Sequence, residues 1–467
     1  MSVTAILWLL LFATFVVLGL ARPRWGAVPY LQSAFAFPAF FWWGKGGVLA
    51  GQRWSLYAGL ILLLSVLMHA KPRPACGRTT STRLFGLLLL ALAINATIVT
   101  FLWSINFTIS SASLFLNLKI ALFAFLLEKT ITTEVDVDFV LIAMTLGLGF
   151  LGFEATVFKG GDMIHGRLEH LGIPGANSSN QLSCLTVTLL PIVGGFAMVG
   201  TGWRKWAAMC CAPFILNISL LCSSRGGFLA VGASAASLLL VTRGKERRYV
   251  IIGMLLGGVG LLFLLKDVAI IDRFATTFAS GENRDASASS RLGFWNAGIK
   301  CLEDHPLGVG GGCYKLQLSI KYIADISTRC RAVHNGPLDE ALAWGCQGLL
   351  LRLIILSVAV FNLRAGSSLW HRLGDPKRAF QGNTMLAGIV GFFVSAFFGD
   401  FLDSEWGVWM CAIASAYLRT ALVAQSRVAE SADFDYGEFT QPFVFPVAPV
   451  YIPAEMARRS LPAPRMD

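Results

Sequence analysis

Long apolar stretches recur along the whole chain and are separated by short polar segments. Most are close to 20 residues long, the length that an α-helix needs to cross the hydrocarbon core of a bilayer. They lie at 3–20, 27–43, 54–70, 84–105, 109–127, 137–157, 182–201, 207–222, 226–242, 249–265, 338–362, 382–402 and 405–423. The pattern predicts an all-α polytopic membrane protein. Because the second stretch contains Pro29 and Pro38, which disfavour a helix interior, the number of transmembrane helices is about 12 or 13.

The composition excludes a soluble globular protein. Of 467 residues, 55% are hydrophobic and 14% are charged, whereas soluble domains have about 25% charged residues. The net charge of +11 is compatible with nucleic acid, a membrane surface or an anionic substrate as partner. Because the cations gather in the loops between apolar stretches, we expect the lipid bilayer as a partner and no nucleic acid.

Charge divides the short loops into two sets. The loops at 71–83, 203–206, 243–248 and 364–378 are basic, and the positive-inside rule therefore places them in the cytoplasm. Counting spans outward from them puts 159–181, the corner at 223–225 and the long segment 267–335 on the outer side. The protein is thus expected to cross a membrane many times, with its large loop on the outer side.

This pattern divides the chain into four parts. Residues 1–266 and 336–423 hold the transmembrane helices, and 267–335 form a large outer loop with short helices. The first apolar stretch lacks the basic start and cleavage site of a signal peptide, so we interpret it as a retained span. Residues 424–467 show no periodicity and are predicted to be a disordered cytoplasmic tail.

The outer loop is basic, although long loops are exempt from the positive-inside rule. Within it, Leu292, Trp295 and Ile299 repeat at helical spacing beside Arg291, which predicts a helix on the bilayer surface. The glycines of 304–312 could form a backbone nest for an anion. The positive charge has two explanations: attraction to anionic head groups, or binding of an anionic substrate at the outer surface.

Arg225 and His334 are the other candidates for chemistry. Arg225 lies in a tight corner between two apolar stretches, where an arginine is costly unless it is paired or hydrated; the alternative is an interfacial anchor. His334 precedes a predicted helix start, with Asn335 as N-cap and Pro337 in the first turn. A histidine there lies beside an anion-binding helix end and can exchange a proton near neutral pH.

Three further features have ordinary structural explanations. Asp136 and Asp138 imitate a metal-binding Asp-x-Asp pattern, but they start a helix on the predicted cytoplasmic side, where capping is expected. Asn177 lies in an outer loop and is expected to frame an outer cavity. Of the ten cysteines, three fall in the outer loop, and the sequence does not choose a disulfide pair among them: Cys301, Cys313 and Cys330.

Several of these residues together resemble a known family. In order along the chain they are Ser-Arg-Gly at 224–226, Arg291 with Trp295, Asp-His-Pro-Leu-Gly-Val-Gly at 304–310, and His334-Asn335 with Leu338 and Gly345. Over roughly 180–405 the chain is similar to the O-antigen ligase and O-antigen polymerase family of bacterial inner-membrane glycosyltransferases. It departs from many members in having Ala176-Asn177 in place of Asp-Pro-Asn.

The resemblance implies a reaction and roles. A glycan preassembled on undecaprenyl diphosphate would be transferred, in the periplasm and without metal or cofactor, onto a lipid, glycan or protein acceptor. Arg225 and Arg291 would hold the diphosphate, His334 would act as base or orienting group, and Asn335 and Asn177 would contact substrate. The alternatives are a polysaccharide polymerase or a protein O-glycosylation ligase of the same family.

Elementary chemistry agrees with these roles. Diphosphate is a good leaving group, and guanidinium groups stabilise its growing charge bidentately. A transporter or flippase for lipid-linked sugars would also place cations in its cavity and is the alternative from another class. We see no internal repeat of the kind that transporters commonly show.

Overall fold

The computed structural model describes residues 2–69, 80–173, 175–264, 286–323, 325 and 327–438. They confirm the all-α prediction, since the only strands in this part of the chain form one hairpin, β1 (Asp162–Ile164) paired with β2 (Arg167–Glu169). The helices are α1 (Val3–Ala21), α2 (Pro23–Phe35), α3 (Trp54–Met68), α4 (Thr80–Ile98), α5 (Phe107–Thr130), α6 (Glu134–Val157), α7 (Ser179–Val199), α8 (Trp203–Leu221), α9 (Arg225–Val241), α10 (Gly244–Leu264), α12 (Ala286–Asp304), α13 (Ile320–Ile323), α14 (Gly336–Arg372), α15 (Pro376–Phe397) and α16 (Glu405–Glu438).

Every predicted apolar stretch overlaps a helix, but not every one of these helices is long and apolar enough to cross a membrane. Among the described residues, eight helices are long and apolar enough to cross a membrane, fewer than the 12 or 13 predicted. The doubtful second stretch forms α2, which has 13 residues and is about 20 Å long. Helices α3 and α9 are apolar but shorter than 18 residues, and α8 and α10 carry cations in their first turns.

The chain divides into two units, Met1–Gln425 and Ser426–Asp467. Helix α16 continues to Glu438, past the end of the apolar stretch at 423. The remainder of the predicted disordered tail, 439–467, lies outside the described residues, as does 265–285 of the outer loop.

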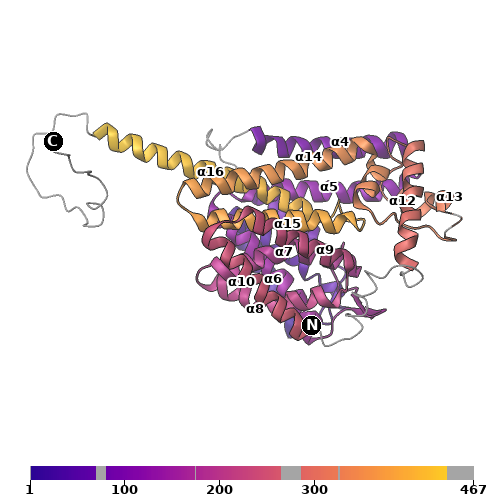
Figure 1. Cartoon of the computed structure of the whole chain (residues 1–467), viewed down its shortest axis with the longest axis horizontal. Coiled ribbons are helices and arrows are strands. Elements are labelled where there is room, and N and C mark those ends of the chain that lie inside the picture. Colours follow the sequence, from indigo (N-terminus) through magenta and orange to yellow (C-terminus); the bar gives the residue numbers. More distant parts are fainter. Residues whose placement is uncertain are drawn as a thin grey trace, which may run out of the picture. The chain divides into compact units, whose positions relative to one another are not determined.

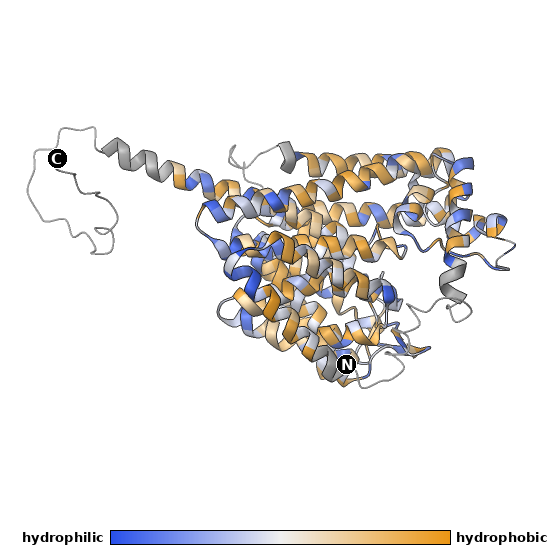
Figure 2. Ribbon diagram, in the orientation of Figure 1, coloured by the Kyte–Doolittle hydropathy of each residue, from blue (hydrophilic) through white to orange (hydrophobic). Residues whose placement is uncertain are grey.

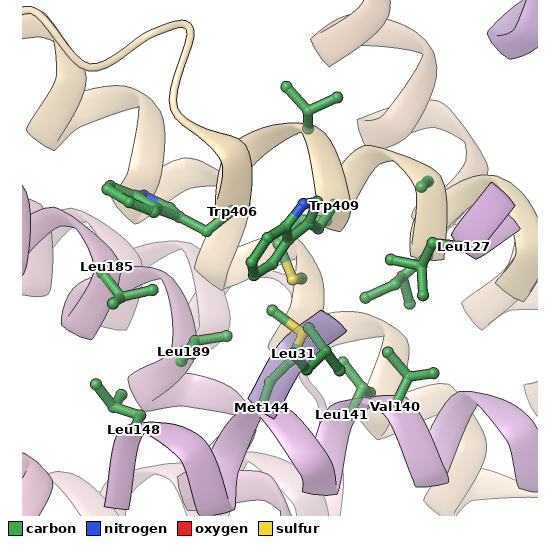
Figure 3. Packing of buried hydrophobic residues seen from close by; sticks show 14 of the residues in the cluster. Leu31, Leu127, Val140, Leu141, Met144, Leu148, Leu185, Leu189, Trp406 and Trp409 are labelled. Carbon is green, nitrogen blue, oxygen red and sulfur yellow. The ribbon is translucent and has the colours of Figure 1, made fainter. Parts of the chain in front are cut away.

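The first unit is a bundle built around α7, α15 and α16. In Figure 1, α15 runs between α14 and α7, and α12 and α13 lie at one end of these helices. The core is formed by buried apolar side chains. Trp406 and Trp409 of α16 are 3% and 2% exposed and lie above Leu141 and Met144 of α6 (Figure 3). Figure 2 shows apolar residues along the lengths of the helices and hydrophilic residues mainly towards their ends, as burial in lipid requires.

Contacts between loops sort them into the same two sets that the charge pattern predicts. At one end, Arg204 and Arg378 both pair with Asp138, and all three belong to predicted cytoplasmic segments. At the other end, the Arg167 side chain donates to the carbonyl of Cys222 at 3.2 Å, joining two predicted outer loops. Which set faces the cytoplasm stays a prediction of the positive-inside rule.

Helix α14 is interrupted near its outer end. Gly345 has a φ of 80°, which L side chains rarely adopt, and it breaks the helix. The segment 306–310 enters the gap, so that Val309 N donates to Leu342 O at 2.8 Å and Gly310 N donates to Ala343 O at 3.1 Å. These bonds fix the outer loop to the first turns of α14.

Candidate functional site

The candidate site is organised by one short segment at the outer end of α15, Ala396–Asp400, which we call the outer hinge. It contacts the start of α9, the side of α12 and the start of α14. These are the three elements that carry Arg225, Arg291 and His334. Sequence positions that are more than a hundred apart are therefore attached to five consecutive residues.

The start of α9 is closely packed against this hinge. Ser224 caps the helix by accepting a hydrogen bond from Gly227 N at 3.2 Å. A Cβ added at Gly226 would lie 3.0 Å from the Cβ of Phe398, so the helix start lies directly on the hinge. Arg225, the half-buried first residue of α9, projects from this fixed corner.

The corner is also held from its other side by a residue that we did not identify from the sequence. Arg167, at the start of β2, donates through Nε to Cys222 O at 3.2 Å and through Nη2 to the Asn180 side chain. Ser224 Oγ donates to the same Asn180 Oδ1 at 2.9 Å. Arg167 thus connects the hairpin to α7 and to the turn that aims Arg225.

Arg291 is carried by α12, which confirms the helix predicted from the spacing of Leu292, Trp295 and Ile299. One turn later, Trp295 packs edge-on against Phe397 of the hinge, with 6.0 Å between ring centroids. Gly298 faces the segment before α14, since a Cβ there would lie 2.8 Å from Val333. Helix α12 is therefore wedged between the hinge and the start of α14, and Arg291 is half-buried.

His334 lies at the start of α14 in a strained backbone conformation. Its φ is 53°, a region that a residue other than glycine occupies at a cost of about 1–3 kcal/mol and that is typical of functional sites. Its Nδ1 lies 3.1 Å from Oδ1 of Asp400. Asp400 is the second residue of the site that we did not identify from the sequence.

This contact defines what the histidine can do. When Nδ1–H donates to the Asp400 carboxylate, the lone pair of the neutral imidazole lies on Nε2. Asn335 confirms its predicted role as N-cap, because its Oδ1 accepts from Leu338 N at 3.0 Å. The Asn335 side-chain oxygen is therefore used to cap the helix, which leaves Nδ2 as the atom that could donate to a ligand.

A lysine and further carboxylates lie near this pair. The carboxylates of Asp339, Asp403 and Asp400 raise the pKa of Lys315 above its ordinary value, while burial opposes the rise. Lys315 therefore stays protonated at neutral pH. The surroundings of the His334–Asp400 pair thus combine a cation with several carboxylates.

Two sequence interpretations are corrected here, and one is confirmed. The glycine-rich segment is not an anion nest, because the amides of Gly308, Val309 and Gly310 already donate to protein carbonyls. Asp136 caps α6 as predicted, in a capping box with Thr133. Asp138 does not cap; it pairs with arginines.

Asn177 is not brought to the hinge by any described contact. Its side chain is exposed, and its carbonyl accepts from His170 N at 2.8 Å. Asn180, three residues later, makes the contacts to the corner instead. The three outer-loop cysteines are free thiols in the structure: Cys301, Cys313 and Cys330.

Comparison with known proteins agrees with the resemblance. Residues 207–353 match the model of a family described as O-antigen ligase. The match covers α8 to the middle of α14 and includes Arg225, Arg291 and His334, but not Asp400. No curated protein matches the chain.

The resemblance to the O-antigen ligase family is therefore confirmed over this part of the chain. The chain is a multi-pass membrane protein in which residues 207–353 are similar to the O-antigen ligase family, whose members are glycosyltransferase-like enzymes.

Proposed function

We propose that this protein transfers a preassembled glycan from undecaprenyl diphosphate to an acceptor hydroxyl at the periplasmic face of the bacterial inner membrane. The observation that carries the proposal is the attachment of α9, α12 and the start of α14 to the outer hinge. The elements attached to the outer hinge carry two guanidiniums and an imidazole. Glycosyl transfer from a diphosphate needs cations for the leaving group and a base for the acceptor hydroxyl, and these side chains can supply both.

Arg225 and Arg291 are assigned to the diphosphate. When the bond between the anomeric carbon and the diphosphate oxygen breaks, the electron pair leaves with the diphosphate, and its negative charge grows. Guanidinium groups bind such oxygens through two parallel N–H donors. The loss of one fixed donor of this kind typically costs about 10²–10³ in rate.

His334 is assigned to the acceptor. The acceptor oxygen forms the new bond to the anomeric carbon, and its proton passes to Nε2 of His334. Asp400, hydrogen-bonded to Nδ1, favours the required tautomer and stabilises the imidazolium that results. A positioned base contributes about 10²–10⁴ in rate, and undecaprenyl diphosphate is released.

The test is a reconstituted assay with a lipid-diphosphate glycan donor. Lipid A core, a second donor molecule and a protein are offered separately as acceptors, and the mass of the product is measured. A product on lipid A core supports a ligase, elongation of the donor glycan supports a polymerase, and a glycosylated protein supports a protein ligase. Translocation of the donor without any new glycosidic bond contradicts the proposal and favours a transporter.

His334→Ala tests the role assigned to the histidine. With His334→Ala, turnover should fall while binding of the donor is kept. A parallel loss of donor binding would instead make His334 a ligand of the diphosphate and contradict its assignment as base.

A further inference from the structure

A large cavity lies at the opposite ends of the helices that form the candidate site. It has a volume of about 940 Å³ and is lined by the ends of α7, α9 and α14 and the starts of α10 and α15. By the positive-inside rule this end faces the cytoplasm. The cavity is therefore remote from the proposed glycosyl transfer and has no role in it.

The lining of this cavity is strongly basic. It contains four cations, Arg243, Lys245, Arg364 and Lys377, and one carboxylate, Glu246, so its net charge with neutral histidine is 4 − 1 = +3. Within the described residues, no ion pair joins any of the four cations to a carboxylate. Among the lining residues, only Glu246 opposes their charge.

The adjacent cavity shows that this imbalance is not a general property of the cytoplasmic end. It has a volume of about 220 Å³ and is lined by Arg204 and Arg378, among others. There the protein supplies the anion, because Asp138 accepts hydrogen bonds from both arginines and from Gln381 at 2.7 Å. The larger cavity has the cations but lacks such a carboxylate.

Part of the remaining wall of the basic cavity is apolar, and the rest carries uncharged polar side chains. Val199, Leu240, Tyr249, Phe380 and Leu386 line it beside the cations. A volume of this size is typical of sites for whole organic ligands and far exceeds the needs of a free phosphate ion. Cations next to an apolar wall at a membrane surface match a molecule with an anionic head and a hydrocarbon chain, and basic pockets between transmembrane helices bind anionic lipid head groups.

We propose that this basic cavity binds the head group of an anionic phospholipid of the surrounding bilayer. The phosphodiester lies among Arg243, Lys245, Arg364 and Lys377, and the first part of an acyl chain lies along the apolar wall. The ligand bridges α9–α10 and α14–α15, whose opposite ends carry Arg225, His334 and the outer hinge. The bound lipid thus ties together the helices that support the outer site.

The test uses the full chain, purified in detergent and stripped of lipid. Binding of phosphatidylglycerol, phosphatidylcholine and soluble glycerol phosphate is measured by native mass spectrometry and by the shift in melting temperature. We expect one phosphatidylglycerol to be retained and to raise the melting temperature. Phosphatidylcholine and glycerol phosphate should do neither at the same concentration.

Matched pairs of substitutions locate the site. Arg243→Gln with Lys245→Gln removes two lining cations, and each should weaken binding about 5-fold, giving about 25-fold together. Arg247→Gln with Arg248→Gln removes two exposed cations of the same segment that do not line the cavity, and binding should stay within about 2-fold. Arg364→Gln with Lys377→Gln repeats the test from the opposite wall.

Three results would overturn the proposal. An equal loss in the control pair would show that diffuse surface charge attracts the lipid. Equal retention of phosphatidylcholine would exclude an anion-selective site, and tight binding of glycerol phosphate would make this a site for a soluble anion. The comparison of lipids on the wild-type protein decides the question even if a double variant fails to fold.

Discussion

The contact between His334 and Asp400 supports a sharp prediction for Asp400→Asn. The distance of 3.1 Å between Nδ1 and Oδ1 is suited to a hydrogen bond in which the imidazole donates to a carboxylate. An asparagine can rotate its amide so that its nitrogen donates to Nδ1 instead. The proton of the imidazole then lies on Nε2, and the atom assigned to accept the hydroxyl proton cannot do so.

The expected loss follows from the role of that atom. A positioned base contributes about 10²–10⁴ in rate, so kcat should fall by that factor, which is about 3–5 kcal/mol in activation free energy. The folded protein should lose little stability, because His334 is 43% exposed and the pair is screened by solvent. KM for the donor should change little, since Asp400 is not assigned to the diphosphate.

The assay measures kcat and KM for the reconstituted enzyme over a range of pH, with binding of the donor measured separately. Asp403→Asn is the matched control, because Asp403 lies three positions away, and no hydrogen bond to His334 is found for it among the described contacts. Asp400→Glu keeps the acceptor charge and should restore part of the activity. The reasoning is refuted if Asp403→Asn is as damaging as Asp400→Asn, or if Asp400→Asn abolishes donor binding along with turnover.

Four other predictions address the arginines, the fold and the topology. Arg291→Lys keeps the charge but loses the planar two-donor contact, so activity should fall about 10²-fold while Arg331→Ala stays close to wild type; equal losses would show that diffuse loop charge governs activity. Arg167→Gln should lower kcat by loosening the corner that bears Arg225, with donor affinity falling in parallel and melting temperature little changed; a pure loss of stability would make it only a structural residue. Glu340 and Arg352 form a buried ion pair at 3.0 Å, so Arg352→Met should lower the free energy of unfolding, measured in detergent, by about 3–5 kcal/mol. The double change Glu340→Leu/Arg352→Met should recover most of that lost stability. In a background without native cysteines, an impermeant maleimide added to intact cells should label Asp325→Cys but not Lys245→Cys, and the opposite pattern would place the candidate site on the wrong face.

The helices could be predicted from the sequence because lipid imposes a strong and local rule. Each apolar stretch must satisfy its own backbone hydrogen bonds, which a helix does within one segment. The cap of α14 could also be predicted, because the Asn335 side chain and Leu338 N are three residues apart. These features depend on neighbours along the chain and therefore leave a signal in it.

The rest of the site depends on partners that are distant in the chain. Asp400 lies near the end of the predicted apolar stretch 382–402, as many interfacial carboxylates do. Only the packing of α15 against α14 brings it to His334. The left-handed backbone of His334 is unexpected for a residue other than glycine. Nothing in the sequence around Arg167 indicates its role, because that role depends on two distant hydrogen-bond acceptors. These are the Asn180 side chain of α7 and the Cys222 carbonyl at the end of α8.

The interruption of α14 at Gly345 also constrains how the protein is made. An intact helix would satisfy the carbonyls of Leu342 and Ala343 within itself, whereas here their donors are Val309 and Gly310, which precede α14 in the chain. With the topology that the charge pattern predicts, the outer loop crosses the membrane first during synthesis and then folds back onto a helix that is inserted after it. Until it docks, the carbonyls of Leu342 and Ala343 lack these two donors, and a carbonyl left unsatisfied in a nonpolar environment costs several kcal/mol. Shortening the outer loop should therefore expose the nascent protein to membrane quality-control proteolysis even where no residue of the candidate site is touched.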